Sequence, residues 1–420
     1  MVVQALPNEL VIAIIEEAQY DDLLPRYKWL KRYCRVCRSW RSIAQRLLFA
    51  HVALLQGAAQ CKAFRDAITS SSSNLPHLFF LRESVRMLSL VIDHQEVYGE
   101  VIELCPNLRE LHLRVNHGFF RPHVLEHLAR GPRIEALRLR TYHRRPSLQL
   151  LEVYQGSLVY LELDYQGVVQ ETPQALGSPL PNLRLRELRY YSVCRETSAF
   201  PEWVLSGPSK DTLQVLHIKC SHFQLDTLAA SGVGARLLSL TTDANCADVD
   251  LAMLAPSLRE LAIESSRISP PALKRLPSGL VHISLRDISE QPYHDIVEAL
   301  TTYYTQSNGS LRVLTYHRRQ ATEKRDAFDD VLELYSFCLA QGIEFRLFQP
   351  VYGYYAGERL SLGPVCSFPR PTPVSSRRGM LDVHNLSLTS ARKQSRIRRM
   401  VKAVGKAFGE GIPPVALAKP

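Results

Sequence analysis

The chain has 420 residues, of which 46% are hydrophobic and 22% are charged. This balance is typical of soluble globular proteins and excludes a collagen-like or wholly disordered chain. The formal net charge is +10, and residues 361–420 contribute +9 of it through eleven Lys or Arg against Asp382 and Glu410. The first 360 residues therefore carry only +1, so we expect no nucleic-acid partner for the body of the chain.

The location of the protein is predicted from what the sequence lacks. The sequence has no run of about 18 uncharged apolar residues, so no transmembrane helix is predicted. Residues 1–10 lack the basic start and apolar core of a secretory signal. The nine cysteines are odd in number and scattered, unlike a disulfide framework. We therefore expect an intracellular protein, in the cytoplasm or the nucleus, with no membrane partner.

Residues 1–55 are expected to be helical. After Leu6-Pro7, with Asn8 as a candidate N-cap, apolar residues recur at helical spacing: Leu10, Val11, Ile14, Ile15 and Ala18. A second helical run is predicted from Tyr27 to about Leu48, and residues 21–25 separate the two runs.

The second run contains the stretch YCRVCRSWR at residues 33–41. A zinc half-site would need a second pair of Cys or His at suitable spacing, and His51 and Cys61 do not form one. A redox CxxC pair would need a preceding strand and a βαβ frame, which the sequence lacks. We interpret Cys34 and Cys37 as small buried apolar residues one helical turn apart, and we predict no metal site.

From about Val85 to Phe348 the pattern LxxLxL recurs. Ten copies begin at residues 85, 108, 134, 158, 185, 213, 235, 258, 280 and 311, so they lie 22 to 31 residues apart, and a degraded copy begins at 343. Turn-forming groups such as CPN at 105–107 and helix-compatible segments such as 122–129 and 292–303 lie between copies. Because one such unit cannot bury its own apolar face, the pattern predicts stacked units whose strands form a parallel sheet.

Two segments carry a resemblance to known families. The repeats resemble the leucine-rich-repeat family, which implies an α/β solenoid with parallel strands on the concave face and helices on the convex face. Leu6-Pro7-x-Glu9-Leu10, Ile14-Ile15 and Val36-Cys37-Arg38-Ser39-Trp40-Arg41 resemble the three-helix F-box, although the stretch between them is longer than is usual in that family. Together they resemble F-box proteins of the fungal type with C-terminal leucine-rich repeats.

This resemblance implies a non-catalytic substrate receptor of a Skp-cullin-F-box ubiquitin ligase. Residues 6–52 would dock on a Skp-type adaptor, and through it on a cullin-RING ligase, with contacts from Leu6, Pro7, Glu9, Leu10, Ile14, Val36, Cys37 and Trp40. An apolar ridge at i, i+4 spacing with an aromatic anchor suits recognition of a helix by a groove. The alternative is a leucine-rich-repeat scaffold whose helical N-terminus is only the cap of the solenoid, with no ligase association.

The substrate surface is predicted from the alternation of side chains along each strand. In LxxLxL the leucines point inward, and the third, fifth and seventh residues point outward. The candidate contacts for an unidentified protein substrate are Arg114, Arg138, Arg140, Tyr160, Arg189 and Tyr191. The arginines favour an acidic or phosphorylated segment, and the alternative is a solvated strand face with incidental charge.

Four regions follow from these patterns: a helical module at 1–55, a linker helix and loop at 56–84, the solenoid at 85–358, and a disordered Pro/Ser-rich linker and basic tail at 359–420. Within the tail, residues 391–408 have the period of a basic amphipathic helix. This helix is a nuclear-import or acidic-partner patch, a membrane-surface helix or a solubilising end. No Gly-rich phosphate loop, HExxH or GxSxG motif occurs, so we predict no enzyme activity and no cofactor.

Overall fold

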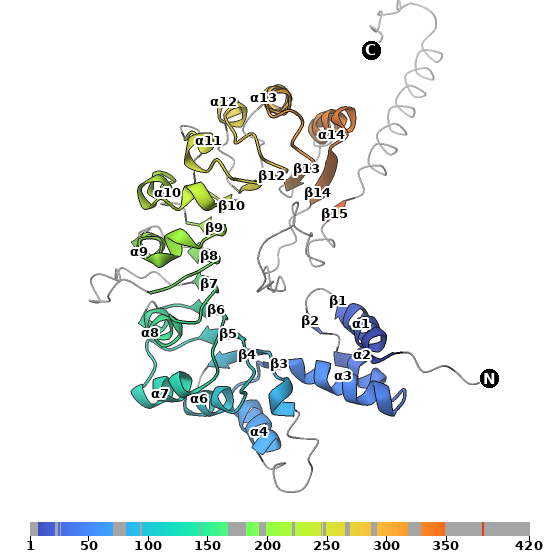
Figure 1. Cartoon of the computed structure of the whole chain (residues 1–420), viewed down its shortest axis with the longest axis vertical. Helices are drawn as coiled ribbons and strands as arrows, with labels where there is room; N and C mark the ends of the chain where they lie inside the picture. The colour runs from blue at the N-terminus through green and yellow to red at the C-terminus, as the bar shows by residue number, and fades with distance from the viewer. Residues whose placement is uncertain are drawn as a thin grey trace, which may run out of the picture.

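A small helical module followed by a curved arc of strands and helices makes up the computed structural model (Figure 1). The strands line the inner, concave side of the arc, and the helices lie on its outer, convex side (Figure 1). The structure describes residues 7–21, 24–25, 27–69, 81–92, 95–143, 145–166, 182–192, 199–220, 223–244, 246, 249–264, 269–286, 292–317, 329–348 and 380–381.

A single sheet of 13 strands runs through the arc in the order of the sequence. Pairing is parallel from β3 to β14, and β15 joins β14 antiparallel. The strands are β3 His51–Leu54, β4 Met87–Ile92, β5 Glu110–Val115, β6 Ala136–Thr141, β7 Tyr160–Tyr165, β8 Glu187–Ser192, β9 Val215–Lys219, β10 Ser239–Thr242, β11 Glu260–Ile263, β12 His282–Arg286, β13 Val313–His317, β14 Glu344–Phe348 and β15 Met380–Leu381. Every predicted copy of the pattern forms a strand, which confirms a leucine-rich-repeat-like solenoid.

Helices return the chain between the strands. They are α4 Ala58–Thr69, α6 Gln95–Glu103, α7 Pro122–Arg130, α8 Arg145–Tyr154, α9 Ala199–Leu205, α10 Asp226–Ser231, α11 Leu251–Leu254, α12 Pro270–Lys274, α13 Tyr293–Gln306 and α14 Asp329–Gln341, with 3-10 turns at Pro208–Asp211 and Gly234–Arg236. Among the described residues, none of the helices is both long and apolar enough to cross a membrane.

The leucines of the repeat pattern build one continuous core between the sheet and the helices. In β5, for example, Leu111 and Leu113 are 0% and 3% exposed, and Leu108 in the preceding turn is 1% exposed. Side chains of this size each contribute about 1.5–3 kcal/mol when fully buried. Each repeat buries its apolar side chains against the repeats before and after it, so stacking stabilises every repeat.

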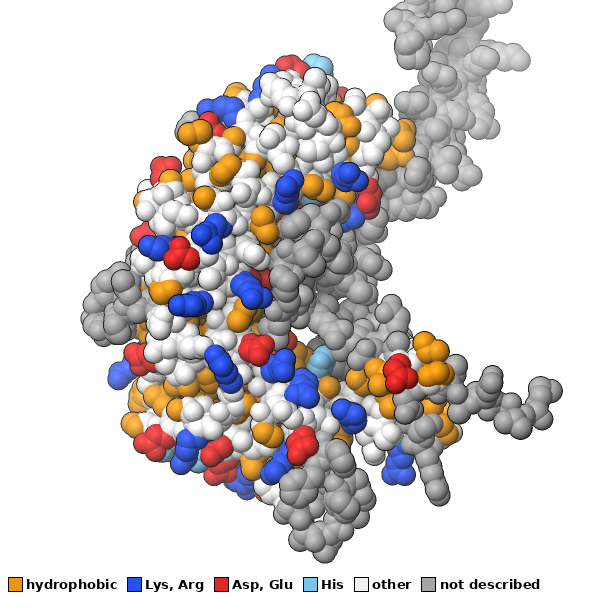
Figure 2. Space-filling view, in the orientation of Figure 1, with side chains coloured by type: hydrophobic (Ala, Val, Ile, Leu, Met, Phe, Trp, Pro, Cys, Tyr) orange, Lys and Arg blue, Asp and Glu red, His pale blue; other side chains and the backbone are white. Residues whose placement is uncertain are grey.

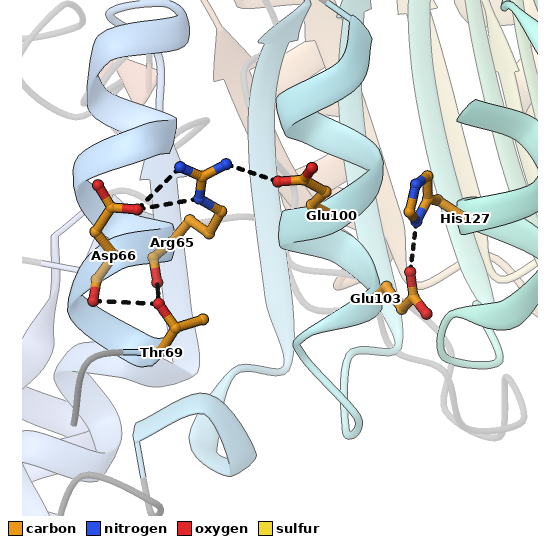
Figure 3. Close-up of polar contacts among 6 residues, drawn as sticks. All are labelled: Arg65, Asp66, Thr69, Glu100, Glu103 and His127. Atoms are coloured by element: carbon orange, nitrogen blue, oxygen red, sulfur yellow. Dashed lines mark hydrogen bonds and ion pairs between the residues drawn. The ribbon is translucent and has the colours of Figure 1, made fainter. Parts of the chain in front are cut away.

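Ion pairs connect successive helices on the convex side (Figure 3). Arg65 of α4 donates from Nη1 to Glu100 Oε2 of α6 at 2.7 Å, and Glu103 of α6 lies 2.6 Å from His127 of α7. These side chains are 28–42% exposed, and water screens ion pairs of this kind, so each pair contributes little to stability. They nevertheless set the lateral contacts of the first repeats.

The sheet begins earlier than the pattern predicted. Strand β3 pairs in parallel with β4, so residues 51–54 belong to the solenoid rather than to the helical module, and α4 in the predicted linker is the helix of this first repeat. At the other end, β15 pairs with β14 inside the region expected to be disordered. The predicted basic helix at 391–408 lies outside the described residues.

The predicted helical run from residue 27 to about 48 is wrong, because it is two helices. They are α2 Tyr27–Tyr33 and α3 Arg38–Ala50, separated by a turn at 34–36 and by Cys37, whose backbone is extended. A single straight helix of that length would extend about 33 Å and keep its two ends apart. The break lets α2 and α3 fold against α1 Asn8–Gln19. A short antiparallel pair, β1 Tyr20–Asp21 with β2 Leu24–Pro25, occupies the lengthened stretch between α1 and α2.

Candidate functional site

The N-terminal module has a core of its own. Val11 and Ile15 of α1, Leu30 of α2 and Ala44 of α3 are all at most 2% exposed and form a cluster distinct from the solenoid core. Six partly buried residues pack around it: Tyr33, Cys34, Trp40, Ile43, Leu47 and Leu48. A terminal cap would share its apolar contacts with the repeat that it covers. The apolar core of the N-terminal helices is thus separate from that of the solenoid.

Large apolar side chains are exposed on the outer surface of this module. Leu10 and Ile14 of α1 are 51% and 45% exposed and lie one helical turn apart, about 100° around the helix from the buried Val11 and Ile15. Val36, in the turn before α3, is 59% exposed, and Trp29 of α2 is 37% exposed. Figure 2 shows hydrophobic side chains gathered on this module. Exposed apolar side chains that lie close together are candidates for contact with another molecule.

The predicted adaptor contacts fall into three groups: one residue outside the described part of the chain, six exposed residues, and the half-buried Trp40. Leu6 lies outside the described residues. Leu10, Ile14 and Val36 are exposed, and so are Pro7, which precedes α1, and Glu9 in its first turn. Cys37 is also exposed, at the position that precedes α3.

Trp40 has a different environment. It is half-buried on α3, and its ring packs edge-on against Tyr33 with the centroids 5.8 Å apart. Val36 and Cys37 precede α3, so they do not form one helical ridge with Trp40, and the interpretation of Cys37 as a buried residue one helical turn from Cys34 is wrong. Trp40 packs against the apolar core of the module. Burial of Cys34 raises the pKa of its thiol, which therefore stays neutral.

On the concave face, the predicted arginines of β6 lie beside carboxylates of β7. The sheet register sets Arg138 opposite Glu162 and Arg140 opposite Asp164. Arg138 Nε lies 3.4 Å from Glu162 Oε2, and Arg140 Nε lies 3.5 Å from Asp164 Oδ2. Arg138 is only 9% exposed. These two arginines are therefore already neutralised by the protein itself.

Tyr160 and Arg189 are part of the same network. Arg189 Nε donates to Glu187 Oε1 at 2.7 Å. Tyr160 is 2% exposed, donates from its hydroxyl to Glu162 Oε2 at 2.7 Å, and lies between the guanidinium groups of Arg138 and Arg189, 5.7 and 5.6 Å from its ring centre. Burial raises the pKa of Tyr160 well above its usual value. Tyr160 was expected to point outward into solvent, and it is instead enclosed.

Arg114 and Tyr191 lie at the ends of their strands. Arg114 is the one exposed member of the four predicted arginines, and the register sets it beside Arg140. Tyr191 is half-buried, with His217 at 4.9 Å between ring centres and Lys219 Nζ at 5.5 Å.

A second charged network fills the concave face of β9 to β13. Glu264 accepts Lys219 Nζ at 2.6 Å and Arg286 Nη1 at 3.2 Å. His282 lies between Glu260 Oε1 at 3.4 Å and Thr315 Oγ1 at 2.9 Å. Sequence reasoning singled out cations strand by strand and missed these pairings. Aligning adjacent repeats position by position would have placed acidic residues opposite basic ones.

The chemistry of these clusters is that of ion pairing. In the described part of the chain, no three His, Cys, Asp or Glu residues are grouped so as to hold a metal ion. Apart from exposed Arg114, the charged side chains described above on the concave face are paired within the protein, and the module presents apolar side chains to solvent.

Comparisons with known proteins give little further information. No family model matches the chain, and no curated protein matches it significantly. Among solved structures, the crystal structure of the Rad7 and Elc1 complex in yeast contains a chain 14% identical to this one, with a TM-score of 0.30, and the match covers 77% of this chain and 96% of that chain. A likeness at this TM-score carries no argument about function.

Proposed function

We propose that the chain is the non-catalytic substrate receptor of a Skp-cullin-F-box type ubiquitin ligase. Residues 6–52 dock on a Skp-type adaptor, which connects the receptor to a cullin-RING ligase, and the solenoid presents a protein target. The observation that carries this proposal is the exposure of Leu10, Ile14 and Val36 on a module whose apolar core is complete without them.

The physical argument is that apolar side chains held one turn apart on a helix fit a groove on a partner. Leu10 and Ile14 expose about half of their surface, and burying them in a groove would remove that surface from water. Val36 extends the apolar surface beyond α1. Trp40 does not contact the adaptor in this arrangement; it holds α3 in place through Tyr33.

The test is co-purification with a co-expressed Skp-type adaptor. The full chain should retain the adaptor, and the variant Leu10→Ala/Ile14→Ala should lose about 2–4 kcal/mol of binding free energy, as expected for central apolar contacts. The matched control is Met253→Ala/Leu339→Ala, which removes two exposed apolar side chains from the solenoid, 82% and 68% exposed. This control should bind like the wild type. If the unaltered chain retains no adaptor, the scaffold alternative replaces the proposal.

Trp40→Ala is a poorer test of docking. Because Trp40 is half-buried against the module core, its truncation should cost less than the roughly 3–5 kcal/mol of a fully buried Trp but would still destabilise the module. Loss of adaptor binding by this variant would therefore not distinguish a lost contact from a destabilised module.

A further inference from the structure

The turns that lead into the strands carry a row of exposed arginines. In the described part of the chain, the exposed arginines within three residues of the strand that follows are Arg86, Arg109, Arg133, Arg184, Arg186, Arg236, Arg259 and Arg312. Backbone hydrogen bonds hold the turns side by side: the N–H of Arg109 donates to Arg86 O at 3.0 Å, and that of Glu344 donates to Arg312 O at 2.9 Å. The eight guanidinium groups therefore follow one edge of the sheet, where the strands begin. We call this row the arginine edge.

The arginine edge is poor in compensating charge. In the described turns before β4 to β13, the carboxylates are Glu83, Glu135 and Asp211. No ion pair joins a member of the edge to a carboxylate within the described residues. Figure 2 shows Lys and Arg side chains recurring along the face of the arc turned to the viewer, with fewer acidic side chains among them.

Four members of the edge are held by backbone carbonyls of a neighbouring turn instead. Arg86 donates to Asn107 O at 3.2 Å and Arg133 to Gly156 O at 3.0 Å. Arg236 and Arg259 make the same kind of contact with neighbouring turns, at 2.8 and 3.2 Å. A guanidinium has five N–H donors, so each arginine keeps its full charge and most of its donors for another molecule.

This distribution contrasts with the concave face. There, Arg138 and Arg140 lie beside carboxylates of the next strand, and Glu264 accepts two cations. The eight arginines of the edge have no such carboxylate partner within the described residues, and such a row attracts anionic partners. The sequence predicted a surface for acidic segments on the concave face, and the exposed arginines instead lie along the arginine edge.

We propose that the arginine edge docks an extended acidic segment of a protein partner. Arg86 and Arg312 flank nine strand spacings of about 4.8 Å, so the edge is about 43 Å long, which an extended chain covers with about 13 residues. Arginine forks match carboxylates in a bidentate manner, and the carbonyl contacts orient four of them in advance.

A polypeptide fits this edge better than a nucleic acid does. The exposed large apolar side chains of the described residues include none in these turns, so bases would find nothing on which to stack. Phe119 and Tyr142, which are exposed aromatic residues, follow β5 and β6 at the opposite edge. The edge also curves with the arc (Figure 1), and a duplex would have to bend to follow it.

This proposal depends on the proposed receptor function in one respect: the partner is taken to be a protein substrate. Its test uses the isolated full chain and no adaptor, so failure of adaptor docking and failure of the edge are separate results.

The probe is a fluorescent poly-L-glutamate of about 20 residues, long enough to span the edge, with binding followed by anisotropy at low and high salt. The edge variant is Arg109→Glu/Arg186→Glu. The matched control is Lys62→Glu/Arg145→Glu, which makes the same charge change at two exposed positions on the helices α4 and α8, away from the arginine edge. The basic C-terminal tail is present in every sample, so it contributes equally to all.

We expect the edge variant to bind the probe about tenfold more weakly than the wild type, with a shallower salt dependence, and the control to change by less than about twofold. Equal losses in both variants, or no loss in either, would overturn the proposal. A single-stranded or duplex DNA probe that binds more tightly than polyglutamate and loses affinity in the edge variant would overturn it in favour of nucleic acid. If circular dichroism shows that the edge variant is unfolded, Arg109→Gln/Arg186→Gln replaces it under the same criteria.

Discussion

Removal of the Glu162 carboxylate should destabilise the solenoid more than removal of the neighbouring Asp164 carboxylate. Glu162 Oε2 accepts the hydroxyl of Tyr160 at 2.7 Å and lies 3.4 Å from Arg138 Nε. The side chains of Arg138 and Glu162 are 10% and 18% exposed. Glu162→Gln keeps the shape of the side chain and an acceptor for Tyr160, so the change removes mainly the charge.

The magnitude follows from burial. Breaking a fully buried pair costs about 3–5 kcal/mol, because it leaves the other charge without its partner in a medium of low polarity. Water reaches part of this pair, so we expect a loss of about 2 kcal/mol for Glu162→Gln. At Asp164 burial raises the pKa of the carboxyl, so the fold already penalises its charged form. Asp164→Asn should therefore cost less than about 1 kcal/mol.

The assay is urea unfolding followed by circular dichroism, with free-energy changes taken from midpoints at constant slope. A double-mutant cycle with Arg138→Met should return a coupling of about 1–2 kcal/mol between Arg138 and Glu162. The reasoning fails if Glu162→Gln has the same midpoint as the wild type, or if Asp164→Asn is the more destabilising change.

Two further predictions concern buried titratable groups. Burial lowers the pKa of His317 to about 4 from its usual value, so the fold favours the neutral ring; stability that is fully present above about pH 6.5 should fall by about 3 kcal/mol as the pH drops from about 6.5 to 4. The free energy of unfolding of the wild type, relative to that of His317→Asn, should therefore decrease by this amount from about pH 7 to pH 4, and a constant difference in urea unfolding would contradict this. Thiol labelling followed by peptide mass spectrometry should modify exposed Cys37 before Cys105 and Cys246, because burial raises the pKa of each of these two thiols to about 12. Equal labelling of Cys105 and Cys37 would contradict this reasoning.

Much of the solenoid could be predicted because its leucines repeat in a short pattern. Each copy of LxxLxL carries its own period-2 alternation, so a strand is visible without its neighbours. Strand β3 was missed because its residues, HVAL, lack the first leucine and directly follow a helix. Only its parallel pairing with β4 identifies it as the first strand.

The concave face was harder to predict, because side-chain pairing depends on the register between strands. Alternation correctly assigned Arg138 and Arg140 to the face opposite the leucines. It did not indicate that Glu162 and Asp164 would lie beside them, which requires the repeats to be aligned with one another. The break between α2 and α3 was also hidden, because Val36 and Cys37 fit a helical period locally while the core requires a turn there.

The repeat pattern also explains why a body of almost neutral net charge has a basic edge. Three repeats contain LREL, and in each the arginine is exposed at the edge: Arg109, Arg186 and Arg259. The glutamate that follows each of them points to the concave face and is paired there, Glu110 with His112, Glu187 with Arg189 and Glu260 with His282. Successive residues of a strand face different directions, so two opposite charges adjacent in sequence lie on different surfaces. The glutamates thus bind partners on the concave face, whereas the arginines remain exposed at the edge.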